Sequence, residues 1–145
     1  MPKILTIDSA VFLSVWDESE ALRLPSVHFF ASLLTEDVNI VIPEIALFEI
    51  GNVLIRLGLR ERLTEYMGLF SSSNQLDVVP LSAEIYTAFI GLSTRLTLKT
   101  ADLIFCTVAH MRDSTLISWD KKLVKEAAKA VRAMTPSQYL SQHSH

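Results

Sequence analysis

The sequence predicts an α/β fold, a three-layer α/β/α sandwich around a parallel sheet of about five short strands. Short apolar runs alternate along the chain with longer segments of helical periodicity, as in βαβ units. The first run, residues 3–7, is apolar almost without interruption, which is typical of a strand buried on both faces of a parallel sheet. The 145 residues, 50% apolar and 20% charged, are enough for one domain with a substantial core.

The expected strands are short, and each is followed by residues that end or redirect the chain. Asp8 follows the first strand, and Pro43 closes the second. Trp119 and Asp120 close a later strand in the way that Asp8 and Ser9 close the first. In order, the expected strands are residues 3–7, 38–42, 76–81, 115–118 and 131–135.

Helices are expected between these strands, bounded by residues that start or stop helices. Asp8 or Ser9 is the expected N-cap of the first helix. Pro25 and Ser26 open the second helix, and Gly58 ends the third. The second helix has its apolar residues at positions 27, 30, 31 and 34. The helices in this half of the chain are 10–13, 27–34, 44–57 and 61–70.

In the second half of the chain, Ser82 and Thr100 are the expected N-caps of two helices. The helices here are 83–95, 101–112, 120–130 and a tail helix from residue 136. The sequence has no internal repeat, low-complexity tract or linker. It therefore predicts a single domain over residues 1–140 and a flexible tail over residues 141–145.

The composition argues against several classes of protein. No apolar run reaches the roughly 18 to 20 residues that a transmembrane helix needs. Asp8 interrupts the N-terminal apolar run, which argues against a secretory signal. The single cysteine, Cys106, has no partner for an intrachain disulfide and suits a reducing cytoplasm.

The charge and hydropathy bear on possible partners. The net charge of −3 and the pI of about 5.8 show no basic field of the kind that favours nucleic-acid binding. Acids that hold divalent cations would shift the charge in this direction without excluding a phosphate substrate. The mean hydropathy of +0.33 is high for a domain of this size, which indicates apolar surface that a partner covers.

Two acids stand where open α/β sheets bind ligands, just outside the carboxyl ends of strands. These are Asp8 and Asp120. If their strands are neighbours, the strand axes lie about 4.8 Å apart and both carboxylates face one cleft. A third acid, Glu49, lies with Asn52 and Arg56 in a narrow polar stripe on an otherwise apolar helix.

A fourth acid, Asp102, lies in the first turn of an apolar helix. Each acid alone also has a structural explanation, as an N-cap (Asp8 and Asp120), as an acid stabilised at a helix N-terminus (Asp102) or as part of a solvated stripe (Glu49). Together, however, crowded carboxylates raise one another's pKa, which is costly without a cation. Mg²⁺ and Mn²⁺ prefer oxygen ligands, and acid-only sites of this kind generate hydroxide for in-line displacement at a phosphodiester.

Four short motifs contain these acids. They are Asp8 after the first strand, PEIALFEIGNVL at 43–54 with Glu49, TADLI at 100–104 with Asp102, and SWDKKL at 118–123 with Asp120. Their order and spacing resemble those of the PIN domain family, and within it the VapC-type toxins and their small stand-alone relatives. The resemblance covers nearly the whole chain. It implies a parallel sheet with the first strand at its centre and a Mg²⁺- or Mn²⁺-dependent endoribonuclease.

The resemblance also implies roles for individual residues. The family's catalytic and metal-binding acids would be Asp8, Glu49, Asp102 and Asp120. Ser9 and Ser118 match its small hydroxyl positions beside the first and last acids, and Asn52 is expected to support the site. Leu103 and Trp119 depart from the family's small or polar residues, which concerns substrate preference rather than metal binding.

Lys99, Trp119 and Lys121 flank the acids and are candidates for substrate contacts. An exposed Trp119 could stack on an unpaired base, whereas a buried one would pack under the last helix. The two lysines could contact phosphates or simply form the solvated face of a surface helix.

The leading hypothesis is a metal-dependent endoribonuclease that cleaves single-stranded RNA by attack of an activated water. Asp8, Glu49 and Asp102 would hold the principal Mg²⁺ or Mn²⁺ ion, and Asp120 would support it or a second ion. The resemblance further implies the toxin of a toxin–antitoxin pair. Two alternatives remain open: a catalytically inactive PIN-like module that binds RNA or protein, and a generic α/β domain whose acids are caps.

Large apolar side chains exceed what a sandwich of this size needs for its own core. We expect a symmetric homodimer, with a small antitoxin as a second partner and the acidic cleft left open. The helices beginning at Val27 and Glu61 are expected to present the surplus, and residues 63–70 to form a groove wall. The side chains concerned are Phe12, Trp16, Phe29, Phe30, Leu33, Tyr66, Phe70, Tyr86 and Phe89.

Overall fold

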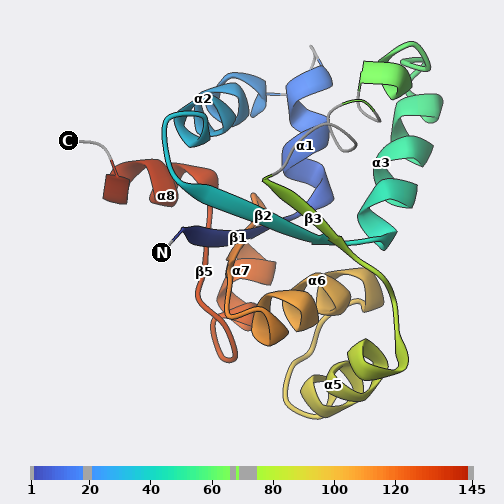
Figure 1. Cartoon of the computed structure of the whole chain (residues 1–145), viewed down its shortest axis with the longest axis vertical. Helices are drawn as coiled ribbons and strands as arrows, with labels where there is room; N and C mark the ends of the chain where they lie inside the picture. Colours follow the sequence, from blue (N-terminus) through green and yellow to red (C-terminus); the bar gives the residue numbers. More distant parts are fainter. Residues whose placement is uncertain (1, 18–20, 66–67, 69–74, 144–145) are drawn as a thin grey trace.

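The computed structural model describes residues 2–17, 21–65, 68 and 75–143. Strands and helices alternate along it, as the sequence predicts (Figure 1). In order, the elements are β1 (Lys3–Ile7), α1 (Ser9–Trp16), α2 (Arg23–Leu33), β2 (Val38–Pro43), α3 (Ile45–Arg56), β3 (Leu76–Val79), α5 (Ala83–Ser93), α6 (Thr100–Met111), β4 (Thr115–Ile117), α7 (Lys121–Ala127), β5 (Ala133–Met134) and α8 (Pro136–His143).

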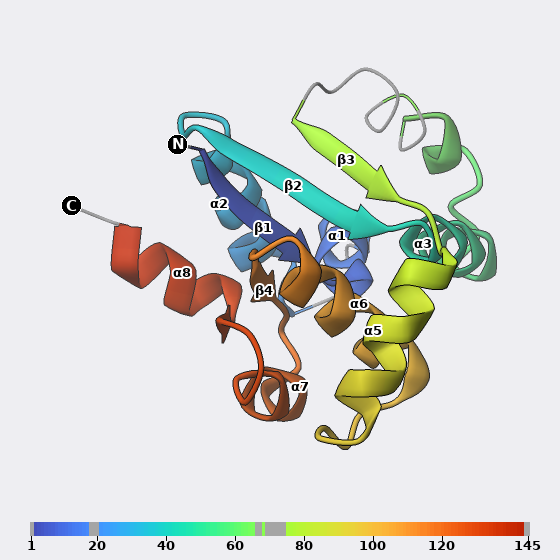
Figure 2. The same cartoon turned by 60° about the horizontal axis from the view of Figure 1, so that its bottom comes forward.

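The sheet has five strands in the order β3-β2-β1-β4-β5, and every neighbouring pair is parallel. This confirms the expected fold class. Figure 2 shows β1 between β2 and β4, the two strands with which it pairs. The chain builds one half of the sheet from β1 outward to β3 and then starts the other half at β4. The strand order therefore reverses between β1 and β4, which is where open α/β sheets place their ligands.

Helices cover both faces of the sheet (Figure 1). Helices α1, α2, α3 and α8 lie on one side, and α5, α6 and α7 lie on the other. On the first side, Val11 and Phe29 pack against Leu5 and Ile7 of the central strand. Burying strand residues on both faces is what an almost uninterrupted apolar strand requires.

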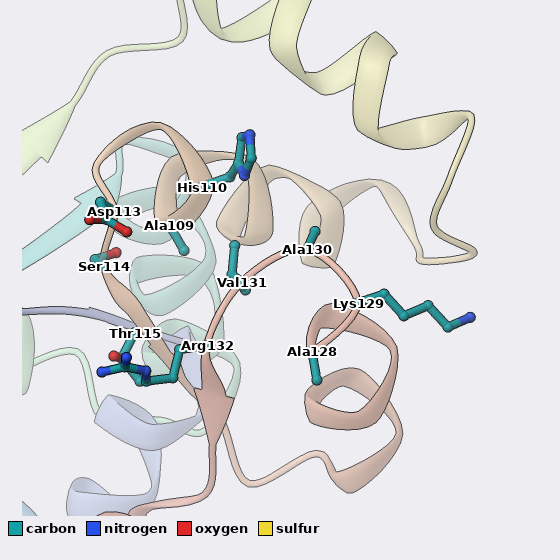
Figure 3. A pocket seen from close by; sticks show the side chains of 10 residues that line it. All are labelled: Ala109, His110, Asp113, Ser114, Thr115, Ala128, Lys129, Ala130, Val131 and Arg132. Atoms are coloured by element: carbon teal, nitrogen blue, oxygen red, sulfur yellow. The ribbon is translucent and has the colours of Figure 1, made fainter.

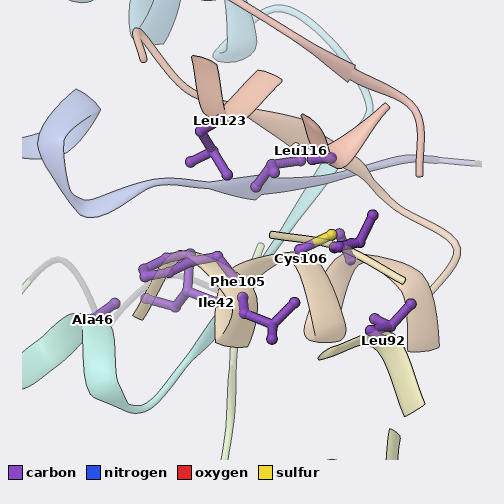
Figure 4. Packing of buried hydrophobic residues seen from close by; sticks show 11 residues of the cluster. Ile42, Ala46, Leu92, Phe105, Cys106, Leu116 and Leu123 are labelled. Atoms are coloured by element: carbon purple, nitrogen blue, oxygen red, sulfur yellow. The ribbon is translucent and has the colours of Figure 1, made fainter. Parts of the chain in front are cut away.

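The core on the second side is formed mainly by α6, which is the most deeply buried helix of that layer. Its Phe105 and Cys106 contact the cluster that contains Ile42 of β2 and Leu116 of β4 (Figure 4). Helix α3 packs separately, with its Ile50 and Leu54 against α1. The helices that follow Asp8 and carry Asp102 are thus held on opposite faces of one sheet.

Helix α2 differs from expectation in its start and in its buried face. It begins at Arg23, and its buried residues are Ser26, Phe29 and Leu33 rather than positions 27, 30, 31 and 34. Leu34 is 81% exposed. The apolar residues Phe29 and Leu33 form the buried face together with Ser26, which is buried through hydrogen bonds that a periodicity pattern does not reveal.

Several helix ends agree with the expected signals. Gly58 follows α3 with φ +73°, a conformation that favours glycine. Ser82 caps α5, since its side chain accepts a hydrogen bond from the Ile85 backbone N–H. Thr100 is not the cap of α6: Lys99 occupies the N-cap position, and its side chain makes no capping bond.

The remaining boundaries differ by a few residues. Strands β3 and β5 are shorter than the expected runs 76–81 and 131–135, and α7 ends at Ala127, before the expected residue 130. Helix α8 continues to His143, past the domain boundary expected at residue 140.

The expected helix 61–70 falls partly outside the described residues. Residues 62–65 and 68 are helical, whereas 66, 67, 69, 70 and the expected loop 71–74 lie outside the described ranges. Within those ranges, every helix is too short or too polar to cross a lipid bilayer.

Candidate functional site: an acidic cluster at the carboxyl edge of the sheet

The four candidate acids come from four different segments. Asp8 follows β1 and Asp120 follows β4, and these two strands are paired in register up to Ile7 and Ile117. The pairing continues one step further, because the Asp8 backbone N–H donates to the Ile117 carbonyl at 2.9 Å. The other two acids lie on helices, Glu49 on α3 and Asp102 in the first turn of α6.

A hydroxyl group fixes the side chain of Asp8. Ser118 Oγ donates to Asp8 Oδ2 at 2.8 Å, and the same hydroxyl oxygen accepts the Asp120 backbone N–H at 3.1 Å. Asp8 occupies the N-cap position of α1, but its side chain makes no capping bond there. The cap explanation therefore does not account for Asp8: its carboxylate is oriented across the sheet, toward β4.

A second hydroxyl holds Glu49. Ser9, the first residue of α1, donates from its buried Oγ to Glu49 Oε1 at 2.8 Å. The end of β1 thus places two consecutive residues in the cluster, one carboxylate and one hydroxyl. Glu49, in the polar stripe of α3, therefore faces the cluster as well as solvent. Its side chain is half-buried.

The four carboxylates influence one another. Burial raises the pKa of Asp8 from 3.8 to about 6; the Ser118 hydrogen bond opposes this, and the charges of Asp102 and Glu49 add to it. Burial also raises the pKa of Asp102, as does the charge of Asp120 beyond it. These charge effects link Glu49 to Asp8, Asp8 to Asp102, and Asp102 to Asp120. All four acids therefore belong to one electrostatic cluster.

Asp120 combines this position with a structural role. Its Oδ1 accepts the backbone N–H groups of Lys122 at 3.0 Å and Leu123 at 3.2 Å, so it caps α7. The cap explanation is correct for this residue. Asp120 also belongs to the acidic cluster, because its charge raises the pKa of Asp102.

The donor chemistry of the cluster fits a hard divalent cation, because all the donors are carboxylate oxygens. The side-chain positions do not yet form a coordination shell. Among the described residues, no three His, Cys, Asp or Glu side chains gather closely enough to hold a metal ion. The four acids act on one another's pKa, but their carboxylate groups lie farther apart than the ligands of a metal ion would.

The other candidate residues surround these acids. Asn52 is exposed on α3, one turn beyond Glu49. Lys99 is exposed at the start of α6, and its charge lowers the pKa of Asp102 against the effect of burial. Lys121, the first residue of α7, is exposed next to Asp120.

Trp119 lies between two residues of the site, and its side chain is partly buried. Its ring packs against the cluster around Phe29, and its indole Nε1–H donates to Ser26 Oγ at 2.8 Å. The second of the two sequence expectations, a packed tryptophan, describes it better. Ser26 and its neighbour Ser14 were not anticipated from the sequence, where two serines on amphipathic helices give no distinctive signal.

A surface hollow among the described residues lies away from the acids. Its volume is about 520 Å³, and it is found at the opposite end of β4, lined by residues 109, 110, 113–115 and 128–132 (Figure 3). In that view the side chains of Lys129 and Arg132 point away from each other. Because these two cations diverge, the acidic cluster remains the better candidate for chemistry.

The comparison with known families agrees with this geometry. A family description, the PIN domain, matches residues 5–129. The chain belongs to the PIN domain family. PIN domains are nuclease domains, and the matched range includes all four acids of the cluster. No curated protein sequence matches the chain.

Several solved structures have the same fold. VapC20 of Mycobacterium tuberculosis, described as a sarcin-ricin loop cleaving toxin, is 13% identical over 88% of this chain and 96% of that one, with a TM-score of 0.71. FitAcB of Neisseria gonorrhoeae is 15% identical over 92% and 98%, with a TM-score of 0.70. VapBC2 of Rickettsia felis, solved with a DNA fragment from its promoter, is 16% identical over 91% and 98%, with a TM-score of 0.67. At these identities the likeness concerns the fold.

Proposed function

We propose that this PIN domain is a metal-dependent endoribonuclease that cleaves single-stranded RNA by attack of water on the phosphodiester. The observation that carries the proposal is the electrostatic coupling of four carboxylates at the switch point of the sheet. Such a cluster destabilises its own charged form, and a bound cation would offset that cost. A fold that needed only helix caps would not require Asp8 to be buried beside two other acids.

Asp8, Glu49 and Asp102 would hold the principal ion, and Asp120 would support it or a second one. When bound, Mg²⁺ or Mn²⁺ would lower the pKa of a coordinated water and offset negative charge on the phosphate. The protein's own contribution is orientation. Ser118 and Ser9 each bind one oxygen of a carboxylate, which restricts the rotation of Asp8 and Glu49 as outer-shell partners do in metal sites.

The RNA would approach over the exposed lysines at the edge of the cluster. Lys99 and Lys121 lie at the start of α6 and α7, each beside an acid of the cluster, and could neutralise phosphates on either side of the scissile bond. These two lysines would supply local positive charge for RNA binding, even though the net charge of the chain is −3.

The biological role we propose is that of a VapC-type toxin restrained by a small antitoxin. Support comes from the similar solved structures, which include VapBC2 of Rickettsia felis and a toxin–antitoxin complex from Klebsiella pneumoniae. A homodimer and a cytoplasmic location complete the proposal, the latter supported by the single free cysteine, Cys106.

One observation favours a second candidate, a PIN domain that binds RNA or protein without cleaving it. In the described part of the chain, no three potential metal ligands stand close together. Cleavage would then require the acids to draw together when an ion binds. If they cannot, the cluster would be a binding surface rather than a catalytic centre.

Cleavage of a mixed, end-labelled RNA pool with Mn²⁺ or with EDTA distinguishes the two candidates. The variant Asp8→Asn keeps the shape of the side chain and removes its charge. Its matched control is Asp113→Asn, because Asp113 is exposed, lies before β4 at the other end of the sheet, and has φ +50°, which asparagine tolerates. We expect the control to cleave like the wild type and Asp8→Asn to lose about a hundredfold or more of the rate.

Metal binding can be measured without activity. Mn²⁺ that binds only the native state should raise the Tm of the wild type; at about 100 times its Kd the stabilisation is roughly 2.7 kcal/mol. Asp8→Asn should respond less than Asp113→Asn. A folded wild type with no cleavage and no Mn²⁺ effect on Tm would support the non-catalytic candidate instead.

A further inference from the structure

A chain of hydrogen bonds, buried at its two serines, joins the loop after β4 to the helices on one face of the sheet. The Trp119 indole Nε1–H donates to Ser26 Oγ of α2 at 2.8 Å. Ser26 Oγ is in turn hydrogen-bonded to Ser14 Oγ of α1 at 2.6 Å. Ser14 also donates to the Val11 carbonyl at 2.8 Å. The chain therefore runs from the indole through two hydroxyls to the backbone of α1.

These hydrogen bonds matter for stability because both serines are buried. Ser26 has no exposed surface and Ser14 is 5% exposed, in a region otherwise formed by apolar side chains. A buried hydroxyl is tolerated when its hydrogen bonds are made, and losing one partner leaves the other unsatisfied. Trp119 is consequently held by a directional bond and not only by ring packing.

Both chain neighbours of Trp119 belong to the acidic cluster. Ser118 donates to Asp8, and Asp120 caps α7 while its backbone N–H donates back to Ser118. A rotation or shift of Trp119 would move both. The loop from Ser118 to Asp120 runs between β4 and α7, which anchor its two ends.

We propose that Trp119 is a positioning residue: its hydrogen bond to Ser26 holds the loop so that Ser118 stays oriented toward Asp8 and Asp120 keeps its place beside Ser118. This rests on the proposed nuclease function for its kinetic consequence, but the structural tie stands independently of it. The proposal replaces the role of Trp119 as a stacking platform for bases. Stacking requires a free ring face, whereas this partly buried indole packs against the cluster around Phe29 and is hydrogen-bonded to Ser26.

The structural tie is tested by NMR on Ser26→Ala. The chain has two tryptophans, so Trp16→Phe assigns the indole signals. In Ser26→Ala we expect the Trp119 Nε1–H signal to shift and exchange faster, and the backbone amides of Ser118 and Asp120 to shift with it. The matched control is Ser32→Ala on the same helix, whose hydroxyl donates to the Phe29 carbonyl and does not reach Trp119. It should leave all three signals in place.

The kinetic consequence is tested with Ser26→Ala and Trp119→Phe. Small displacements of catalytic groups reduce rates steeply, so both variants should lose about tenfold to a hundredfold in kcat with KM unchanged. Ser26 is fully buried and cannot touch RNA, so its effect must pass through one of its two hydrogen-bond neighbours, Trp119 or Ser14, and a matching loss in Trp119→Phe assigns it to Trp119. Trp119→Phe keeps an aromatic ring, so a stacking role alone would leave its kinetics near those of the wild type.

Two results would overturn the proposal. One is a folded Ser26→Ala protein in which the Ser118 and Asp120 amides do not shift. The other is cleavage at the wild-type rate by both Ser26→Ala and Trp119→Phe, as a stacking role alone would allow. If the wild type cleaves no RNA, the proposed function fails, but the NMR comparison still decides the structural tie. Should Ser26→Ala not fold, Ser26→Cys nearly keeps the volume, weakens the acceptor and serves in its place.

Discussion

At the scale of single residues, Asp8 shows how a functional group opposes the stability of its own fold. It ends the central strand, so its carboxyl group is enclosed between β1 and β4 and loses most of its contact with water. This burial raises the pKa of Asp8. The Ser118 hydrogen bond lowers that pKa, and the charges of Asp102 and Glu49 raise it further. A residue chosen for folding alone would be neutral at this position.

The pH dependence of stability follows from this raised pKa. Below pH 3.8 Asp8 is protonated in both the folded and the unfolded chain, so it has no net effect. Between pH 3.8 and about 6 the unfolded chain releases the proton first, so metal-free stability falls as the pH rises and levels off above that window. At about 1.4 kcal/mol per pKa unit, the loss is on the order of 3 kcal/mol.

Urea unfolding of metal-free protein across this window tests the assignment. Asp8→Asn should be more stable than the wild type near pH 7 and should lack the decline attributed to Asp8, while Asp113→Asn should keep it. If the free energy of unfolding changes equally with pH in the wild type and in Asp8→Asn, Asp8 ionises normally in the folded protein.

At the scale of elements, α7 depends on an acid of the site for its first turn. Asp120 accepts two backbone N–H groups of α7 and also contributes charge to Asp102 on α6. The helix that closes the second half of the sheet is therefore started by the same residue that extends the acidic cluster.

Two substitutions at Asp120 should separate these roles. Asp120→Ala removes both the cap and the charge, and should destabilise the protein by about 1 kcal/mol. Asp120→Asn keeps an oxygen that can cap α7, so its stability should stay near that of the wild type, while its cleavage and Mn²⁺ response fall. Urea unfolding and RNA cleavage measure the two effects. If Asp120→Ala is as stable as the wild type, the cap contributes nothing to α7.

At the scale of the whole molecule, the exposed apolar surface covers more elements than the sequence predicted: Leu24 lies on α2, as expected, and further residues lie on α3 and α5. Phe29 and Leu33 are buried in the core, and Phe12, Phe30 and Phe89 are half-buried. Tyr66 and Phe70 lie outside the described residues. The large apolar side chains that the structure leaves exposed are Leu24, Leu34, Phe48, Ile55, Leu57, Leu81, Tyr86, Ile90 and Met111.

Helices α3 and α5 therefore become the expected dimer surfaces. Phe48 is 72% exposed and lies with Ile55 on α3, while Tyr86 is 64% exposed and lies with Ile90 on α5. We expect analytical ultracentrifugation at micromolar concentration to show a dimer, because exposed apolar surface of this kind is usually covered by a partner. Ile55→Glu or Ile90→Glu should weaken it. Sedimentation of the wild type as a monomer would mean that a different protein covers this surface.

The sequence by itself determined the parallel sheet and the place of two acids. Apolar strands such as 3–7 and 115–118 have a local pattern, and residues that follow paired parallel strands must share one edge. The pattern of strands therefore predicted that Asp8 and Asp120 share one edge if their strands are neighbours, and the structure adds the pairing of β1 with β4. The N-cap role of Ser82 and the helix stop at Gly58 were also predictable, because both depend on the conformation of adjacent residues.

Only the tertiary structure decided how the rest of the site is held. The bonds from Ser9 to Glu49 and from Ser118 to Asp8 join segments far apart in the chain. The buried face of α2 was missed for the same reason, since the partner of Ser26, Trp119, lies 93 positions away along the sequence. Periodicity records which residues avoid water, whereas a buried hydroxyl depends on a specific donor or acceptor that another element brings to it.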